Sequence, residues 1–191
     1  MCFVCTGNPT YDRLYNIFLD KGAKINMKSL VVYFSCSGVT RGVARKLSNI
    51  TNSDLFEIIP EETYTETDLD WTNKNSRSSV EMNDNDSRPK IKNKIENIND
   101  YDVIYLGFPI WWYVAPKIIN TFLEQYDFSG KTIVPFCTSG SSGLGNTIQE
   151  LKPSCSESTN WIDGKRFSSN VSDDEIGTWI NILKIQNCIA N

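Results

Sequence analysis

Three side-chain hydroxyls and a glycine lie together in the short segment S-C-S-G-V-T, residues 35–40. Ser35, Ser37 and Thr40 can donate hydrogen bonds, and Gly38 lets the backbone approach a ligand closely. An apolar run precedes the segment and helix-forming residues follow it. A helix that starts directly after such a turn points its free N–H groups and its positive dipole end at an anion. The segment therefore predicts an anion-binding loop, although an ordinary capped turn contains the same residue types.

Two further segments have residue types that suit a flat, conjugated ligand. Residues 109–116 read P-I-W-W-Y-V-A-P, and flat apolar walls favour stacking on an aromatic ring. Because adjacent side chains diverge, we expect one tryptophan to pack inward and the other to meet the ligand. Residues 138–145, T-S-G-S-S-G-L-G, offer glycines and backbone N–H groups to the polar edge of such a ring. Core tryptophans and a flexible helix start are the plainer alternatives.

These segments follow the expected strands of an alternating α/β chain. Strands are predicted at 30–34, 54–59, 103–106, 132–136 and 158–162, and helices at 43–50, 89–98, 116–123, 146–152 and 173–185. Such alternation predicts a parallel sheet with helices on both faces. Ligands of these sheets bind beyond the carboxyl ends of the strands, which is where all three segments lie.

One long polar stretch, residues 60–90, lacks any periodic pattern. A connection of that length is usually functional or disordered. Tyr64, Leu69 and Trp71 predict that it packs back onto the domain. It also carries the acidic residues expected nearest to the ligand, which are Glu61, Glu62, Glu66, Asp68 and Asp70.

Composition narrows the function classes. The 191 residues suit one domain with a sizeable core. A net charge of −4 argues against nucleic acid as a partner and suits a basic protein partner. The chain has no histidine, which removes Ser–His and Cys–His nucleophiles and favours chemistry carried by a bound cofactor.

The cysteines and the N-terminus indicate a reducing setting and a short extension. The six cysteines lack the spacing of a disulfide scaffold, and the C-x-x-C at Cys2 and Cys5 has no second pair to close a metal site. No apolar run is long enough to cross a membrane. We therefore expect a cytoplasmic protein with free thiols, no metal and no membrane contact. Residues 1–26 are predicted to be an N-terminal extension with one amphipathic helix, packed on the domain at 27–191 or on a second copy in a homodimer.

The segment S-C-S-G-V-T resembles the phosphate loop (Thr/Ser)-x-(Thr/Ser)-G-x-Thr of flavodoxins, which bind flavin mononucleotide (FMN). P-x-W-W at 109–112, D-L-D-W at 68–71 and R-P-x-I at 88–91 extend the resemblance over about residues 28–186. It implies a flavodoxin-like doubly wound, five-stranded parallel sheet of order 2-1-3-4-5, in which one ligand can touch all three segments. The FMN contacts that it implies are Ser35, Cys36, Ser37, Gly38, Val39, Thr40, Pro109, Ile110, Trp111, Trp112, Tyr113, Thr138, Ser139, Gly140 and Gly143. Trp112, rather than Trp111, is the expected ring contact.

The resemblance implies a flavodoxin that carries electrons between redox partner proteins. One alternative is an FMN-dependent NAD(P)H:quinone-type oxidoreductase, and another is a flavin-free flavodoxin-like interaction module. Other phosphate-binding classes fit poorly. A low-molecular-weight phosphatase needs C-x5-R, but only four residues separate Cys36 from Arg41. The G-x-G-x-x-G and Walker motifs are absent, and a receiver-domain aspartate is missing at Gly107 or Phe108.

The strand order also makes a geometric prediction for two cysteines. Cys36 and Cys137 end strands that are separated by one other strand. Two strand spacings place them about 9–10 Å apart, which is beyond the reach of a disulfide.

Overall fold

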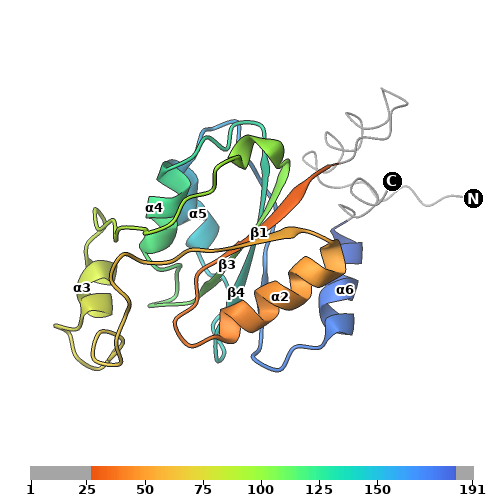
Figure 1. Cartoon of the computed structure of the whole chain (residues 1–191). Coiled ribbons are helices and arrows are strands. Elements are labelled where there is room, and N and C mark those ends of the chain that lie inside the picture. Colours follow the sequence, from red (N-terminus) through yellow and green to blue (C-terminus); the bar gives the residue numbers. More distant parts are fainter. Residues whose placement is uncertain (1–26, 184–191) are drawn as a thin grey trace, which may run out of the picture.

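A computed structural model describes residues 27–183 (Figure 1). The predicted extension at 1–26 and the end of the chain, 184–191, lie outside the described residues. The strands β1 (Ser29–Tyr33), β2 (Asp54–Glu57), β3 (Val103–Pro109) and β4 (Thr132–Thr138) are parallel. The sheet order β2-β1-β3-β4-β5 confirms the predicted one.

The central strands form the core of the sheet. β1 and β4 are buried along their whole length, and β3 is buried up to its last residue. In the register of the sheet, Leu30, Ile104 and Ile133 lie side by side. Burial on both faces explains why these strands appear in the sequence as continuous apolar runs.

Two short strands share the fifth position in the sheet. β5 (Asn160–Trp161) pairs with the start of β4, and β6 (Lys165–Phe167) pairs with its end, both in parallel. The sheet of the described residues therefore has six strands. The five predicted positions of the sheet are confirmed, but the single last strand predicted at 158–162 is divided into two short strands.

Pro135 accounts for the break between β5 and β6. The Ile133 carbonyl accepts a hydrogen bond from Ile162 at 3.0 Å, so the fifth position lies on that side of β4. Pro135, two residues further on, faces the same side and has no N–H to donate. Gly164 passes beside it, where an added Cβ would lie only 2.3 Å from the Pro135 oxygen. The chain therefore leaves the ladder and rejoins it at β6.

Helices cover both faces of the sheet, as predicted (Figure 1). α2 (Val39–Thr51) and α6 (Asp173–Ile182) contribute to one apolar cluster. α4 (Ile118–Glu124) and α5 (Thr147–Leu151), which continues into the 3₁₀ helix η2 (Lys152–Ser154), contribute to the cluster on the other face. No helix within residues 27–183 combines the length and apolar character needed to cross a membrane.

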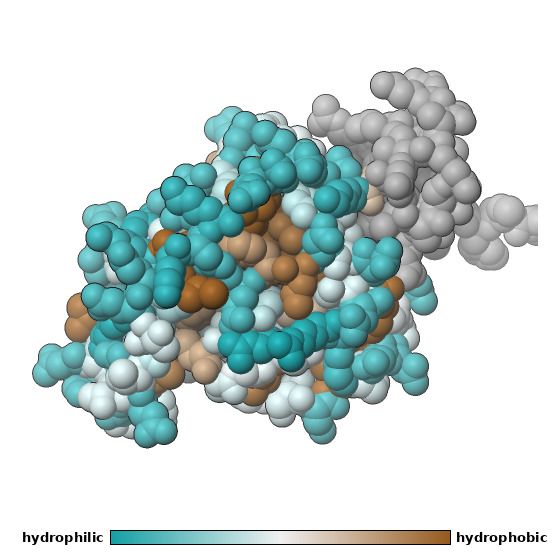
Figure 2. All heavy atoms as spheres, in the orientation of Figure 1, coloured by the Kyte–Doolittle hydropathy of each residue, from teal (hydrophilic) through white to brown (hydrophobic). Residues whose placement is uncertain are grey.

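The outer strand β2 leaves apolar side chains accessible at one edge of the sheet. β2 lies in front in Figure 1, and Figure 2 shows hydrophobic atoms over this part of the molecule. Leu55, within β2, and Ile59, two residues beyond its end, are both exposed. These two side chains add apolar surface to this edge of the sheet.

The helix predicted at 89–98 does not form. Its first part is extended instead, because the Lys92 N–H donates to the Ile59 carbonyl at 2.8 Å and Ile91 bridges to Pro60. Ile91 and Ile95 still pack against the core. The only helical turn near this segment is the 3₁₀ helix η1 (Ile98–Asp100).

A short helix that was not predicted, α3 (Arg77–Asn83), lies within the long polar stretch. The Ser76 hydroxyl caps it by accepting a hydrogen bond from the Ser79 N–H. The stretch packs back through Tyr64 and Leu69, as predicted, but Trp71 is exposed instead. α3 was missed because its apolar residues form no stripe, and Val80 is exposed.

Candidate functional site

The three predicted loops meet at the carboxyl edge of the sheet. They follow the adjacent strands β1, β3 and β4, and together they line a cleft of about 780 Å³. The predicted residues that belong to its lining are Cys36, Ser37, Pro109, Ile110, Trp111, Trp112, Tyr113, Ser139 and Gly140. Ser35, Gly38, Val39, Thr40, Thr138 and Gly143 were predicted as well but are not part of that lining.

The first loop, residues 35–40, leaves the start of α2 open. Gly38, at the N-cap, has a φ of 83° and no side chain, and no side chain caps the helix. The Gly38 N–H donates to Ser35 Oγ at 3.1 Å, which shapes the turn. Uncapped amides at the end of a 13-residue helix, beside neighbouring hydroxyls, form a site for an anion.

Arg41, the cation that directly follows the first loop in the sequence, is already paired. Its Nη2 lies 2.5 Å from Glu57 Oε1, and the Tyr33 hydroxyl donates to Glu57 Oε2 at 3.0 Å. Hydrogen bonding to Glu57 raises the pKa of Arg41 still further, so the ion pair persists at neutral pH. An anion at the first loop would therefore be held mainly by neutral donors and the helix dipole.

A buried hydrogen bond ties the first loop to the third loop, residues 138–145. Thr40 Oγ1 and Thr138 Oγ1 lie 2.8 Å apart. Both residues are buried, and neither belongs to the cleft lining. The pair instead fixes the distance between two of the three loops.

The second loop, residues 109–113, ends in a strained turn. Trp111 and Val114 exchange backbone hydrogen bonds at 2.9 and 3.0 Å, and between them Trp112 and Tyr113 have φ values of 44° and 71°. Two successive positive φ angles define a type I′ turn, for which Asn-Gly is the favoured sequence. Bulky residues in this backbone region carry strain. The turn thus holds aromatic side chains where the local backbone disfavours them.

The two tryptophans diverge as expected. The Trp111 ring packs edge-on against Phe34 and Tyr64, with centroids 5.8 and 5.4 Å apart. Trp112 is 41% exposed and Tyr113 is 75% exposed. All three of these second-loop residues line the cleft. Trp111 therefore joins the cleft to the core, and Trp112 faces outward.

An arginine that was not predicted supports the third loop. Arg166, from β6, donates to the carbonyls of Ser139 and Gly140 at 3.0 and 3.2 Å. The Ser139 hydroxyl also donates to the Ser142 carbonyl within the loop. Arg166 was missed because β6 itself was missed, and no local pattern places residue 166 beside residue 139.

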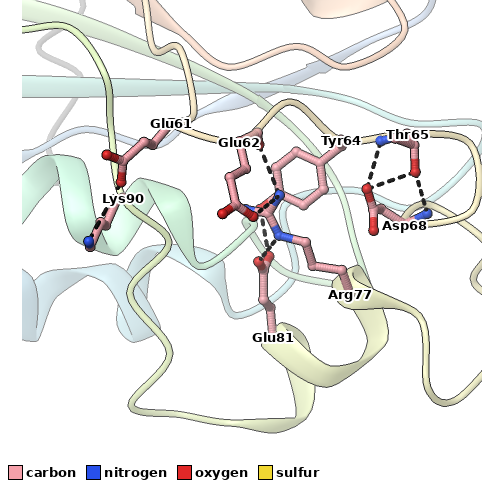
Figure 3. A network of polar contacts seen from close by, with 8 residues as sticks. All are labelled: Glu61, Glu62, Tyr64, Thr65, Asp68, Arg77, Glu81 and Lys90. Carbon is pink, nitrogen blue, oxygen red and sulfur yellow. Dashed lines mark hydrogen bonds and ion pairs between the residues drawn. The ribbon is translucent and has the colours of Figure 1, made fainter.

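The long polar stretch supplies a fourth wall to the cleft, which the site prediction did not include. Leu69, Trp71 and Ser78 line the cleft from this side, and Ser141 and Ser142 add to the third loop. Figure 3 shows the polar contacts that hold this wall, centred on Arg77. The D-L-D-W segment at 68–71 was the available signal, since Leu69 and Trp71 lie within it.

The cysteine in the first loop is not set up as a nucleophile. Although Cys36 as a residue is exposed, desolvation around its thiol raises the pKa to about 12. The thiol is therefore protonated at neutral pH, and only the thiolate attacks phosphorus or carbon. Cys36 and Cys137 are both free, as the strand order predicts. Within residues 27–183 no group of three metal-ligating side chains comes together.

Fold and cleft together define a doubly wound α/β protein with its ligand site at the carboxyl edge of the sheet. The family model described as Flavodoxin matches residues 28–183. The chain therefore belongs to the flavodoxin family.

Solved structures agree with this assignment. A candidate flavoprotein from Bacteroides eggerthii is 48% identical, with a TM-score of 0.78 over 83% of this chain and 99% of its own. One from Bacteroides uniformis is 45% identical, with a TM-score of 0.77 over 82% and 99%. A Lactobacillus acidophilus flavoprotein, solved in complex with FMN, is 24% identical with a TM-score of 0.58 over 81% and 99%, which shows a shared fold. Among curated proteins, none matches the sequence significantly.

Proposed function

We propose that this chain binds FMN in the cleft and carries electrons between redox partner proteins. The observation that carries this proposal is the convergence of three loops, from three adjacent strands, on one cleft with aromatic walls and an uncapped helix start. Membership of the flavodoxin family and the FMN complex of the Lactobacillus flavoprotein support it.

The residues present fit FMN. The first loop would hold the phosphate through the hydroxyl of Ser37 and the first amides of α2. Trp112 would contact the ring, and the third loop near Gly140 would meet its polar edge. The buried Ser78 hydroxyl has no partner within residues 27–183, which is expected where a ligand completes the site. When bound, FMN supplies the redox chemistry, while the chain positions the ring and limits its contact with water.

Acidic groups beside the cleft suit a basic protein partner. Asp68 and Asp70 flank Leu69, which lines the cleft. Hydrogen bonds from Thr65 lower the pKa of Asp68, and those from Thr72 lower the pKa of Asp70, so both carboxylates stay charged at neutral pH. Complementary charge of this kind mainly raises association rates and is screened by salt.

A second candidate function, an NAD(P)H:quinone-type oxidoreductase, is favoured by exposed aromatic side chains. Trp71 and Tyr113 are each 75% exposed, and both line the cleft. Flat exposed rings offer a stacking surface to a second planar ligand beside the flavin.

Titration of the purified apoprotein with FMN tests the binding step. We expect quenching of flavin fluorescence that saturates at one FMN per chain. The variant Ser37→Ala, in the first loop, should weaken binding, whereas Ser48→Ala, on α2 away from the cleft, is the matched control. Absence of binding by the wild type would leave the flavin-free interaction module as the better interpretation.

Rapid-mixing reduction of the FMN-loaded protein separates the two redox functions. A carrier should be reduced slowly by NADH and NADPH and quickly by a reduced partner protein. Fast, saturable reduction by a nicotinamide nucleotide would favour the oxidoreductase. We also propose a cytoplasmic location, which the free thiols of Cys36, Cys137 and Cys155 support.

A further inference from the structure

One buried hydroxyl in the cleft wall has no partner. Ser78, on α3, is 1% exposed, and its Oγ makes no hydrogen bond within residues 27–183. A buried hydroxyl without a partner costs free energy, so native proteins rarely keep one without a reason. The other described residues with such an oxygen are Tyr105, Thr121 and Thr147, and none of them lines the cleft. Ser78 is therefore the orphaned group that a ligand in the cleft can reach.

The position of Ser78 is fixed by the residues around it. Its own N–H donates to the Asp68 carbonyl at 3.0 Å, which leaves only the hydroxyl for another partner. On one side of it, Arg77 donates from Nε to Glu81 Oε1 at 2.7 Å and from Nη1 to the Glu62 carbonyl at 2.9 Å. The first of these bonds lies within α3, and the second attaches the helix to the preceding stretch of chain (Figure 3).

The same network joins α3 to the core beside the first loop. The Arg77 guanidinium lies 4.1 Å from the centre of the Tyr64 ring, and the Tyr64 hydroxyl donates to Glu81 Oε2 at 2.5 Å. The Tyr64 ring packs in turn against Phe34 and Trp111. The charge of Arg77 also acts on Cys36. Ser78 thus belongs to the wall that lies next to the first loop.

We infer that Ser78 is a further ligand-binding residue, whose hydroxyl forms a hydrogen bond with the ribityl phosphate chain of FMN. This inference rests on the proposed function. The first loop supplies donors from one wall of the cleft, and α3 adds a neutral hydroxyl from the wall next to it. The contact would lock the fourth wall onto the bound nucleotide, and Arg77 and Glu81 act as positioning residues for it.

The test compares Ser78→Ala with Ser79→Ala, which lies next to it on the same helix. Both serines are buried, but the Ser79 hydroxyl is already bonded to Ser76 Oγ at 2.9 Å. We expect Ser78→Ala to raise the Kd for FMN by about 5- to 10-fold, the loss of one hydrogen bond. The urea midpoint of the Ser78→Ala apoprotein should stay unchanged or rise. Ser79→Ala should instead lower that midpoint and change the Kd by less than about twofold.

A parallel titration with riboflavin, which lacks the phosphate, shows which part of FMN the Ser78 hydroxyl contacts. A loss on Ser78→Ala that is seen with FMN but not with riboflavin places the bond on the phosphate, and a loss with both places it on the ribityl hydroxyls. FMN binding by Ser78→Ala within twofold of the wild type would overturn the inference, as would a loss matched by an equal fall in apoprotein stability. Failure of the wild type itself to bind FMN would instead overturn the proposed function, and with it this inference.

Discussion

Two kinds of force hold the walls of the cleft. The loops after β1, β3 and β4 continue strands that are almost wholly buried, so apolar packing sets their position. The fourth wall, within residues 60–90, is held by charged and polar side chains as well as by the packing of Tyr64 and Leu69. Arg77 pairs with Glu81 within this wall, and Arg88 ties the wall to Glu124 on α4. We therefore expect a change in the sheet to affect mainly stability, and a change in the fourth wall to affect ligand binding as well.

Truncation of a buried side chain in the sheet should give the largest loss of stability with little change in binding. Ile104 is fully buried in β3 and does not line the cleft. Ile104→Ala should lower the free energy of unfolding by about 2–5 kcal/mol. Urea denaturation of the apoprotein measures this, and an FMN titration below the transition checks the Kd. A large rise in Kd would show that the two sets of walls are not separate.

Removing the charge of Arg77 should reduce FMN binding as well as stability. Arg77→Met leaves the Glu81 carboxylate, whose side chain is only 12% exposed, without its ion-pair partner. We expect a loss of about 1.5–3 kcal/mol in unfolding free energy and a clear rise in the Kd for FMN. Adding Glu81→Gln should recover part of the stability, because no unpaired carboxylate remains. If Arg77→Met destabilises the fold but leaves the Kd unchanged, the fourth wall does not contribute to binding.

The strained second loop offers a sharper contrast, because stability and binding should move in opposite directions. Asparagine tolerates positive φ better than tyrosine does. Tyr113→Asn should therefore raise the unfolding free energy of the apoprotein by about 0.5–1 kcal/mol while it weakens FMN binding. Trp71→Asn is the matched control, since Trp71 is equally exposed in the same cleft but has no positive φ. A gain in stability in both variants would point to hydrophobic exposure rather than strain.

The last effect, similar in size to that of Tyr113→Asn, depends on pH. Arg88 donates to both oxygens of Glu124, at 2.8 and 2.9 Å, and this lowers the pKa of Glu124 below its ordinary value of 4.5. A lowered pKa stabilises the fold above the ordinary value, and that stabilisation is lost as pH falls through the lowered pKa. Arg88→Gln should cost about 0.5–1 kcal/mol at pH 7, because both side chains are partly solvated.

Urea denaturation at pH 7 and at pH 3 measures this difference. The gap between Arg88→Gln and the wild type should narrow at the lower pH. A gap that stays constant would mean that Arg88 acts through packing rather than through the charge of Glu124.

The parts of the fold that apolar burial determines could be predicted from the sequence. The run at 30–34 could be recognised as a strand because burial on both faces leaves a continuous apolar signature. The segment 89–98 was wrongly predicted to be a helix, because the spacing of Ile91, Ile95 and Ile98 suits a helix face. In the structure the Ile95 N–H donates to the Tyr126 hydroxyl at 2.7 Å, across 31 positions in the sequence. Local periodicity cannot indicate a hydrogen-bond partner that is so distant in the sequence.

The residues of the site also fall into those that the sequence could predict and those that it could not. Cys36, Trp112 and Gly140 follow predicted strands, so their meeting in one cleft could be expected. Ser78 and Arg166 could not be, because α3 is fixed by a polar network and β6 by a break in a ladder. Both are set by tertiary contacts that no short segment encodes.

The gap between β5 and β6 also bears on how the molecule meets its neighbours. An approaching strand from another chain needs a long row of free backbone donors and acceptors to pair with. Beyond β4 it would find only a two-residue and a three-residue stretch, separated where Gly164 passes Pro135. This border of the sheet is therefore poorly suited to strand-by-strand self-association, a safeguard against aggregation that arises from one proline and one glycine.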